Sequence, residues 1–153
     1  MTTTVIAPVA GRTVALGDVP DPVFGQGMVG YGAAIDPPRE VITAVAPVGG
    51  RLLKLMPHAF VVLTADNVGV LVHLGLDTVA LDGQGFTTHL QQGEQVRARQ
   101  PVITFDVPAV VAKGLDPIVP VVVMDEREAA NISVTAALDA AIASGDELFV
   151  AHR

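Results

Sequence analysis

The chain has 153 residues, a net charge of -7 and no cysteine. This length suits one domain with a hydrophobic core, which we expect to span residues 1–153. The lack of cysteine excludes disulfides, thiolate metal sites and cysteine nucleophiles, and the acidic balance makes nucleic acid and anionic membranes poor partners. No apolar run approaches the roughly 18 residues of a membrane span, and the first residues do not resemble a signal peptide, so we expect a cytoplasmic protein.

The apolar content predicts strands rather than helices. Half of the residues are hydrophobic but only 4% are aromatic, and 15 glycines and 11 prolines punctuate the chain. Short valine-rich segments between glycine and proline are typical of an all-β protein, an antiparallel sandwich or barrel. We expect strands near residues 12–16, 32–36, 41–45, 50–54, 59–64, 69–74, 78–81, 101–106, 118–124, 131–134 and 147–151.

Two internal echoes suggest a sheet protein built from two related halves. The segment 7–12 recurs as residues 46–51, and each copy opens an apolar run. A second echo pairs residues 93–96 with residues 145–148. Matches of this length are common by chance, so the echoes support a duplication without proving one.

The segment 18–30 is predicted to be an irregular loop because prolines and glycines interrupt it. It nevertheless carries Val23, Phe24, Met28 and Val29. Since loops normally lie on the surface, these apolar side chains either fold back into the core or form an interaction patch.

Two histidines stand at the ends of one predicted β-hairpin. Residues 59–64 and 69–73 are apolar runs that flank the turn-forming residues 65–67. If the hairpin folds about the Ala65–Asp66 bond, His58 and His73 are cross-strand partners with Cβ atoms roughly 4.5–5.5 Å apart. A slip of the register would change the partner of His73, so the pairing depends on the turn.

Two neighbouring imidazoles can divide a phosphoryl-transfer reaction between them. Neutral imidazole is a nucleophile near pH 7, and a second ring can donate an N–H to the phosphoryl oxygens. Asp77 lies four residues beyond His73, close enough to reach the rim of the same site. The backbone of Gly75 or the hydroxyl of Thr78 could orient a ring by accepting from its other nitrogen.

Other interpretations of the pair stay open on the residues alone. His58 and His73 could be a structural pair of partly buried histidines, or two ligands of a zinc ion that a partner completes. A biotinyl or lipoyl carrier would need a lysine in an exposed hairpin turn, which neither Lys54 nor Lys113 provides.

Two short segments that follow the histidine hairpin in the chain are predicted as possible helices. Residues 108–114 begin with a proline and end with a glycine, as short helices often do. The alanine-rich segment 136–143 could also be helical.

Several motifs together resemble the glucose-type enzyme IIA family, the phosphocarriers of the bacterial phosphoenolpyruvate-dependent sugar phosphotransferase system. The string Val72-His73-Leu74-Gly75-Leu76-Asp77-Thr78-Val79, followed by residues 81–86, is similar to the active-site signature of that family. His58-Ala59-Phe60 resembles its second histidine motif, and residues 18–24 its N-terminal loop. The segments 7–11 and 46–50 also fit, so the resemblance runs from about residue 5 to 151.

The resemblance implies a pseudo-duplicated antiparallel β-sandwich with one or two short helical turns. His73 would be phosphorylated on Nε2, accepting the group from phospho-HPr and passing it to a cysteine of a IIB domain. His58 would be the auxiliary histidine, which steadies the phosphoryl group, and Thr78 a possible support. No cofactor would be required, although zinc could bind His58 and His73 with a partner, and a zinc-binding interaction module is the alternative function.

The resemblance also implies a partner surface around the histidines. Asp21 and Asp77 would hold an arginine of HPr. An apolar face for docking both partners would consist of Val23, Phe24, Val29, Phe60 and Leu71. The protein would be peripheral to the membrane only through the permease that carries the IIB domain, and regulatory protein targets are possible. Because no linker is visible at either end, we expect a free-standing protein.

The chain departs from the family pattern in three places. The segment from Gly50 to His58 is two residues shorter than in enteric relatives, and residues 55–57 leave no hydroxyl before the first histidine. Asn67 stands in the hairpin turn where glycine is usual, and asparagine tolerates the left-handed backbone that the turn needs. Leu71 replaces an aromatic residue, which makes the docking face less sharply defined.

Overall fold

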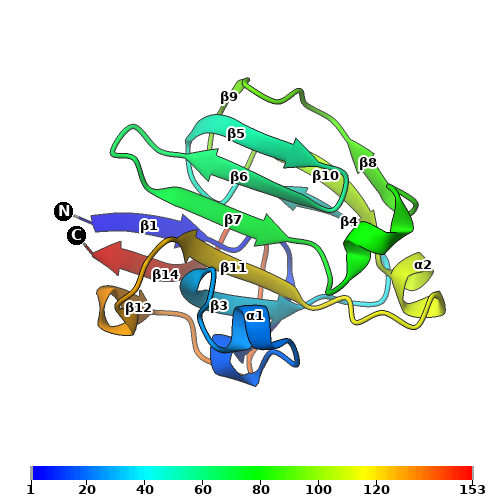
Figure 1. Ribbon diagram of the computed structural model, residues 1–153, viewed down its shortest axis with the longest axis horizontal. Coiled ribbons are helices and arrows are strands. Elements are labelled where there is room, and N and C mark those ends of the chain that lie inside the picture. Colours follow the sequence, from blue (N-terminus) through cyan, green and yellow to red (C-terminus); the bar gives the residue numbers. More distant parts are fainter. Residues whose placement is uncertain (1, 153) are drawn as a thin grey trace.

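A computed structural model describes residues 2–152 and confirms the all-β prediction. An eight-stranded sheet in the order β13-β2-β3-β11-β7-β6-β5-β9 packs with two three-stranded sheets, β1-β14-β12 and β4-β10-β8, and the strand pairs are antiparallel (Figure 1). The strands are β1 (Thr2–Ile6), β2 (Gly11–Ala15), β3 (Gly30–Asp36), β4 (Val41–Val45), β5 (Gly50–Met56), β6 (Ala59–Leu63), β7 (Gly69–His73), β8 (Phe86–Thr88), β9 (Gln95–Val96), β10 (Pro101–Asp106), β11 (Val119–Met124), β12 (Ile132–Val134), β13 (Ala141–Ile142) and β14 (Glu147–His152). The helices are η1 (Leu16–Asp18), α1 (Pro22–Gly25), η2 (Thr78–Leu81), α2 (Val107–Ala112) and η3 (Ala129–Asn131).

Most predicted strands are present, but residues 78–81 form the 3-10 helix η2 and not a strand. The residues on either side, Asp77 and Asp82, have left-handed backbone with φ of 58° and 49°, which ends any extended run. The predicted helix 108–114 is confirmed as α2, with Pro108 in its first turn and the Asp106 carboxylate accepting from the Ala109 amide at 3.1 Å. Strands β1, β8, β9 and β13 were not predicted.

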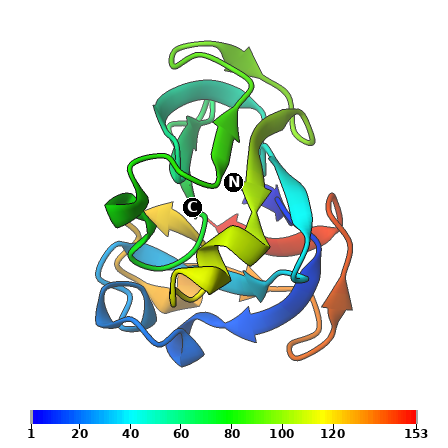
Figure 2. The same cartoon turned by 90° about the vertical axis from the view of Figure 1, so that its right-hand side faces the viewer.

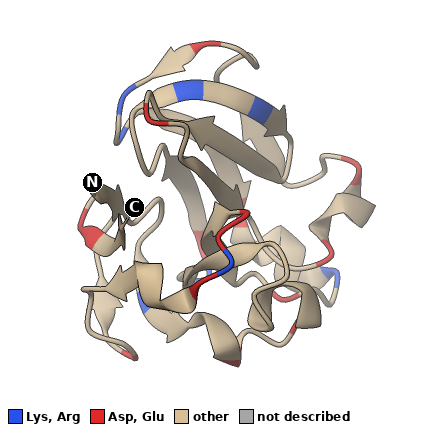
Figure 3. Ribbon diagram, turned by 60° about the vertical axis from the view of Figure 1, so that its left-hand side comes forward, with Lys and Arg blue, Asp and Glu red and all other residues tan. Residues whose placement is uncertain are grey.

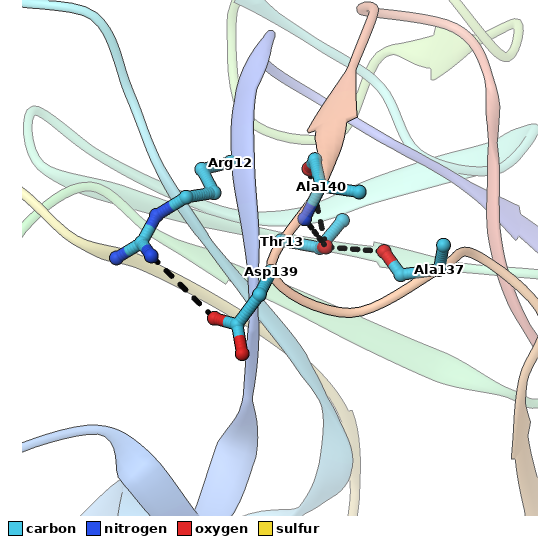
Figure 4. A network of polar contacts seen from close by, with 5 residues as sticks. All are labelled: Arg12, Thr13, Ala137, Asp139 and Ala140. Atoms are coloured by element: carbon cyan, nitrogen blue, oxygen red, sulfur yellow. Dashed lines mark hydrogen bonds and ion pairs between the residues drawn. The ribbon is translucent and has the colours of Figure 1, made fainter.

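The alanine-rich segment 136–143 is not helical, because its polar backbone groups bond to β2 instead. The Thr13 hydroxyl donates to the carbonyl of Ala137 and accepts from the amide of Ala140 at 3.2 Å (Figure 4). The Thr13 amide donates to the carbonyl of Ala140 at 3.0 Å. A guanidinium nitrogen of Arg12 lies 3.5 Å from a carboxylate oxygen of Asp139. This network aligns the segment along β2, where residues 141–142 form β13.

The first echo is a structural repeat. The residue before each copy donates to the proline of the other copy: the amide of Ile6 to the carbonyl of Pro47 at 3.0 Å, and the amide of Val45 to the carbonyl of Pro8 at 2.9 Å. The second echo is real but was paired in the wrong register. Residues 145–146 contact Ala7 as residues 99–100 contact Ala46, so the counterpart of segment 145–148 begins at residue 99 and not at residue 93.

The main core lies between the sheets, which curl round it (Figure 2). Alternate residues of β6 and β7 point into this core, Phe60, Val62, Val70 and Val72, and all are 0% exposed. The intervening residues, Ala59, Val61 and Leu71, lie on the outer face in a second apolar cluster with Phe24, Leu76 and Ile118. Because side chains alternate along a strand, His73 is also placed on this outer face.

Candidate functional site

The rings of His58 and His73 are neighbours, with centroids 5.1 Å apart and planes at 72°. This confirms that the two histidines form one pair. His73, at the end of β7, is partly exposed, whereas His58 is 8% exposed. The ring of His73 is therefore the one that solvent reaches, and the ring of His58 lies next to it and is more buried.

The predicted register of the pair is wrong by one residue. His73 pairs with Ala59 across the hairpin, and His58 lies in the tight turn between Met56 and Ala59 that joins β5 to β6. Because His58 has left the strand, its ring does not follow the alternation of side chains and can turn toward His73. The amide of Leu74 donates to the carbonyl of His58 at 2.8 Å, which ties this turn to the end of β7.

The hairpin turns at residues 64–68, as predicted, but it is centred on Asp66 and not on the Ala65–Asp66 bond. The amide of Asn67 donates to the carbonyl of Thr64 at 3.0 Å, and the Thr64 hydroxyl accepts from the amide of Val68 at 3.0 Å. Asn67 has φ of 64°, the left-handed conformation expected of asparagine in place of glycine.

The backbone of Gly75 orients the ring of His73. The Nδ1 atom of His73 lies 2.5 Å from the carbonyl oxygen of Gly75. A carbonyl oxygen only accepts hydrogen bonds, so Nδ1 must carry the proton. In the neutral ring the lone pair available for attack is then on Nε2.

Thr78 supports the site through the loop and not, as the sequence also allowed, by accepting from a histidine ring, since the acceptor for His73 is the Gly75 carbonyl. Its side chain is fully buried, and its hydroxyl donates to the carbonyl of Leu74 at 2.9 Å. A Cβ added at Gly75, whose φ is 87°, would come within 2.6 Å of the Thr78 methyl group. Glycine is therefore required at position 75, and the loop has little freedom to shift.

Burial sets the protonation of both rings. Burial lowers the pKa of His73, opposed by the hydrogen bond to Gly75 and by the charges of Asp21 and Asp77. Burial also lowers the pKa of His58, and the adjacent His73 lowers it further. Both imidazoles therefore stay neutral, and one of them nucleophilic, at a more acidic pH than an ordinary histidine.

The two predicted acidic residues act on the same ring from different elements. The Asp21 carboxylate caps α1 by accepting from the Val23 amide at 2.8 Å, and Asp77 is an exposed residue before η2. Acidic residues dominate the loops, whereas β5 carries two basic side chains (Figure 3). Asp21 and Asp77 thus place negative charge beside a ring that is itself neutral.

The predicted apolar face is only partly correct. The ring of Phe24 packs on His73 with centroids 5.1 Å apart, Val23 is 43% exposed and Val29 is half-buried. Phe60 is 0% exposed and points into the main core, so its assignment to a docking face is wrong. Leu71 lies on the outer face but is 7% exposed, and it packs beneath the surface rather than presenting a side chain to a partner.

Two exposed apolar residues beside the histidine motifs were missed as candidates. Val79 is 65% exposed and lies two residues after Asp77, and Met56 is 38% exposed and lies two residues before His58. Met28, one of the apolar residues noted in segment 18–30, is 60% exposed and does not fold back into the core. The sequence showed apolar residues beside both histidine motifs, but it did not show which of them face solvent. We call the four exposed apolar residues of segment 18–30 and of the two histidine motifs the apolar rim: Val23, Met28, Met56 and Val79.

The donor atoms do not favour a metal centre. Within residues 2–152, no three histidine, aspartate or glutamate side chains are grouped so that they could hold a metal ion. The two imidazoles alone supply only two of the four ligands of a tetrahedral zinc ion. The zinc-module alternative is not supported, and a zinc ion completed by a partner stays a prediction. No helix of the described chain is both long and apolar enough to cross a membrane.

Comparison with known proteins places this site in a known context. The family model for the phosphoenolpyruvate-dependent sugar phosphotransferase system, EIIA 1, matches residues 3–129. The chain is 38% identical over 137 residues to the PTS system glucose-specific EIIA component of Oceanobacillus iheyensis, covering 86% of this chain and 82% of that protein. It is 39% identical over 128 residues to the mannose-specific EIIBCA component of Corynebacterium glutamicum, covering 84% of this chain but 19% of that protein.

A solved structure shares the whole fold. The glucose permease IIA from Mycoplasma capricolum superimposes with a TM-score of 0.86 at 32% sequence identity, and the match covers 98% of this chain and 96% of that one. The likeness extends beyond the histidine loops to all the sheets that carry them.

Proposed function

The chain belongs to the EIIA 1 family of the phosphoenolpyruvate-dependent sugar phosphotransferase system, and from this membership we propose that it carries the phosphoryl group on Nε2 of His73. Membership makes it a phosphoryl carrier and a phosphotransferase component of sugar uptake. The observation that supports His73 is its hydrogen bond from Nδ1 to Gly75, which leaves the lone pair on Nε2.

The first step is acceptance from a phosphohistidine donor, for which we propose HPr. The Nε2 lone pair of His73 attacks phosphorus, the new N–P bond forms, and the bond to the donor nitrogen breaks with its electron pair returning to that nitrogen. Because burial keeps His73 neutral, no proton has to leave Nε2 before attack.

The second step is donation to a IIB domain. A cysteine thiolate of that domain attacks phosphorus, the S–P bond forms, and the electron pair of the N–P bond returns to Nε2 of His73. The EIIBCA relatives of Corynebacterium glutamicum and the glucosamine-specific EIICBA component of Bacillus subtilis are named for B, C and A parts in one protein, which supports a IIB partner here.

His58 is the electrostatic helper, and its help matters most in donation to the IIB domain. Its ring lies edge-on to His73 with centroids 5.1 Å apart, so an N–H of His58 can reach the oxygens of a phosphoryl group on the neighbouring ring. A hydrogen bond aimed at these oxygens stabilises the charge that they share in the transition state. His58 is 8% exposed, which suits a supporting role better than direct contact with two partners.

The surface around His73 suits two successive protein partners. Asp21 and Asp77 would pair with a basic side chain, such as an arginine of the donor, and the apolar rim of Val23, Met28, Met56 and Val79 would dock the partner. Because His73 is partly exposed at the end of a strand, both partners can reach the same ring in turn.

The test is incubation with phosphoenolpyruvate, enzyme I and HPr, followed by peptide mass spectrometry under conditions that preserve phosphohistidine. We expect one phosphoryl adduct on the peptide that contains His73, and none in His73→Gln. An adduct on the peptide of His58 alone, or no adduct with an HPr shown to be phosphorylated, would contradict the proposal.

A further inference from the structure

The turn formed by residues 116–118 holds the loop that orients His73. We propose that Asp116 is a positioning residue whose carboxylate, acting through this turn, fixes the Gly75 carbonyl and thereby keeps the proton of His73 on Nδ1. The importance of this tautomer for phosphoryl transfer rests on the proposed function, whereas the structural effect does not.

The Asp116 side chain closes the turn on itself. Its Oδ1 atom accepts a hydrogen bond from the amide of Ile118 at 2.9 Å across Pro117. This bond, from a side chain to the amide two residues later, is an Asx turn. Pro117 fixes its own φ angle within the turn. The Asp116 carboxylate restrains the rest of the turn by holding the Ile118 amide.

The closed turn presents two carbonyl groups to the active-site loop. The carbonyl of Asp116 accepts from the amide of Leu76 at 2.8 Å, and the carbonyl of Ile118 accepts from the amide of Gly75 at 3.1 Å. Leu76 and Ile118 are 5% and 6% exposed, so water has little access to replace these bonds. The loop is thus held from the side opposite to His73.

One peptide plane joins Asp116 to His73. The carbonyl of Gly75 and the amide of Leu76 belong to the same planar, trans peptide group, in which they point in opposite directions. The carbonyl end accepts from Nδ1 of His73 at 2.5 Å, and the amide end donates to Asp116 at 2.8 Å. A tilt of this plane at the Asp116 end must therefore move the oxygen that faces His73.

Removing the carboxylate would release this plane. Without Oδ1, the amide of Ile118 has no acceptor in a site where the residue is 6% exposed, so the turn has to reshape to satisfy it. The change reaches Gly75 as well, because its amide donates to the Ile118 carbonyl in the same turn at 3.1 Å. The Gly75 oxygen then moves away from Nδ1, and the proton can shift to Nε2.

The effect is expected to come from hydrogen-bond geometry and not from charge. The acidic charges that act on the pKa of His73 are those of Asp21 and Asp77. Asp116 instead faces a surface pocket that it shares with Asp18, Asp36 and Arg39. Its influence on the ring is therefore carried by the backbone of residues 75–76.

Three substitutions separate geometry from charge. Asp116→Asn keeps the acceptor but loses the charge, Asp116→Glu keeps the charge but is too long for the same turn, and Asp116→Ala loses both. Nitrogen-15 spectra of histidine-labelled protein report the tautomer of His73 directly. We expect Asp116→Asn to match the unsubstituted protein, and Asp116→Glu and Asp116→Ala to show a several-fold larger fraction with the proton on Nε2.

The rate of phosphoryl acceptance should change in the same variants as the tautomer. In the glutamate and alanine variants the turnover constant for phosphoryl acceptance should fall about ten- to a hundredfold, with the KM for phospho-HPr unchanged because the docking surface is intact. Asp146→Ala is the matched control, since it removes a carboxylate that accepts from the Ala143 amide at 3.0 Å in the turn before β14. This control should leave both the tautomer and the rate unchanged.

Two outcomes would overturn the inference. One is an unchanged His73 tautomer in both Asp116→Ala and Asp116→Glu. The other is a shift in Asp116→Asn as large as that in Asp116→Ala, which would make charge the cause. If the unsubstituted protein accepted no phosphoryl group, the proposed function would fail, whereas the spectra would still decide the role of Asp116.

Discussion

Nδ1 of His73 donates a hydrogen bond to the carbonyl oxygen of Gly75 over 2.5 Å. This single contact determines which ring nitrogen has a free lone pair, and it makes the two ends of the imidazole chemically different. The asymmetry between His58 and His73 follows from it, because the tautomer and exposure of His73 suit attack whereas the burial of His58 suits support.

Substitution of each histidine should separate the two roles. His73→Gln should abolish acceptance, because the nucleophile is lost. His58→Gln should leave acceptance largely intact but slow donation to a IIB domain by about ten- to a hundredfold, because a donor to the phosphoryl oxygens is lost. Rapid-quench assays of the two half-reactions would measure this, and equal loss of both steps in His58→Gln would refute the assignment.

Acceptance should persist at acidic pH. Burial lowers the pKa of His73 below the ordinary value of 6.5, so the ring stays neutral and nucleophilic as the pH falls through 6.5. The acid limb of the rate of acceptance against pH should therefore lie below 6.5 when measured with excess phospho-HPr. A midpoint above 6.5 would mean that the acidic neighbours outweigh burial.

Stability should decrease over the same pH range. In the unfolded chain His58 and His73 bind protons near the ordinary value of 6.5, whereas in the folded protein they bind them at lower pH. The unfolded state therefore takes up protons first as the pH falls below 6.5, and the free energy of unfolding decreases until the folded pKa values are passed. Urea titrations of the protein and of a His58→Gln, His73→Gln double variant would show this difference.

Asp21 and Asp77 should each contribute both to partner binding and to the pKa of His73. Asp21→Asn or Asp77→Asn should raise the KM for phospho-HPr about two- to fivefold at low salt, since exposed charge pairs are weak. Either change should also lower the pKa of His73, because each carboxylate raises it. Glu40→Gln, at an exposed carboxylate before β4, is the control, and an equal effect there would indicate only a change in net charge.

Phe60 should matter for stability and not for docking. Its side chain is 0% exposed in the main core, so Phe60→Ala should lower the free energy of unfolding by about 3–5 kcal/mol. Val79→Ser, at a 65% exposed position of the apolar rim, should leave stability almost unchanged and raise the KM for a partner. Chemical denaturation and steady-state transfer would distinguish the two, and a raised KM with full stability in Phe60→Ala would contradict the packing.

The sequence predicted the histidine pair for a reason that was only half correct. Turn-forming residues 65–67 identified the hairpin, and its position brought the two ends together. The register depends on which of these residues forms the turn, which composition does not determine. His58 reaches His73 from the β5–β6 turn, whereas the predicted register placed it directly opposite His73 across the hairpin.

Residue roles were harder to predict than the fold. Motif resemblance indicated Phe60 as a contact residue, but the alternation of side chains along β6 turns it into the core. The same alternation is hidden in the sequence, because residues 59–63 are apolar on both faces. Asp116 escaped notice because its effect on residues 75–76 requires two loops that are distant in sequence to lie side by side.

The central claim is that the phosphoryl group is bonded to Nε2 of His73. It is tested most directly by long-range proton–nitrogen correlation spectra of the nitrogen-15-histidine-labelled protein before and after phosphorylation with phosphoenolpyruvate, enzyme I and HPr. We expect the Nε2 resonance of His73 to move and to couple to phosphorus, while Nδ1 keeps its proton and its hydrogen bond to Gly75. Phosphorus coupling at Nδ1 of His73, or at either nitrogen of His58, would contradict the claim.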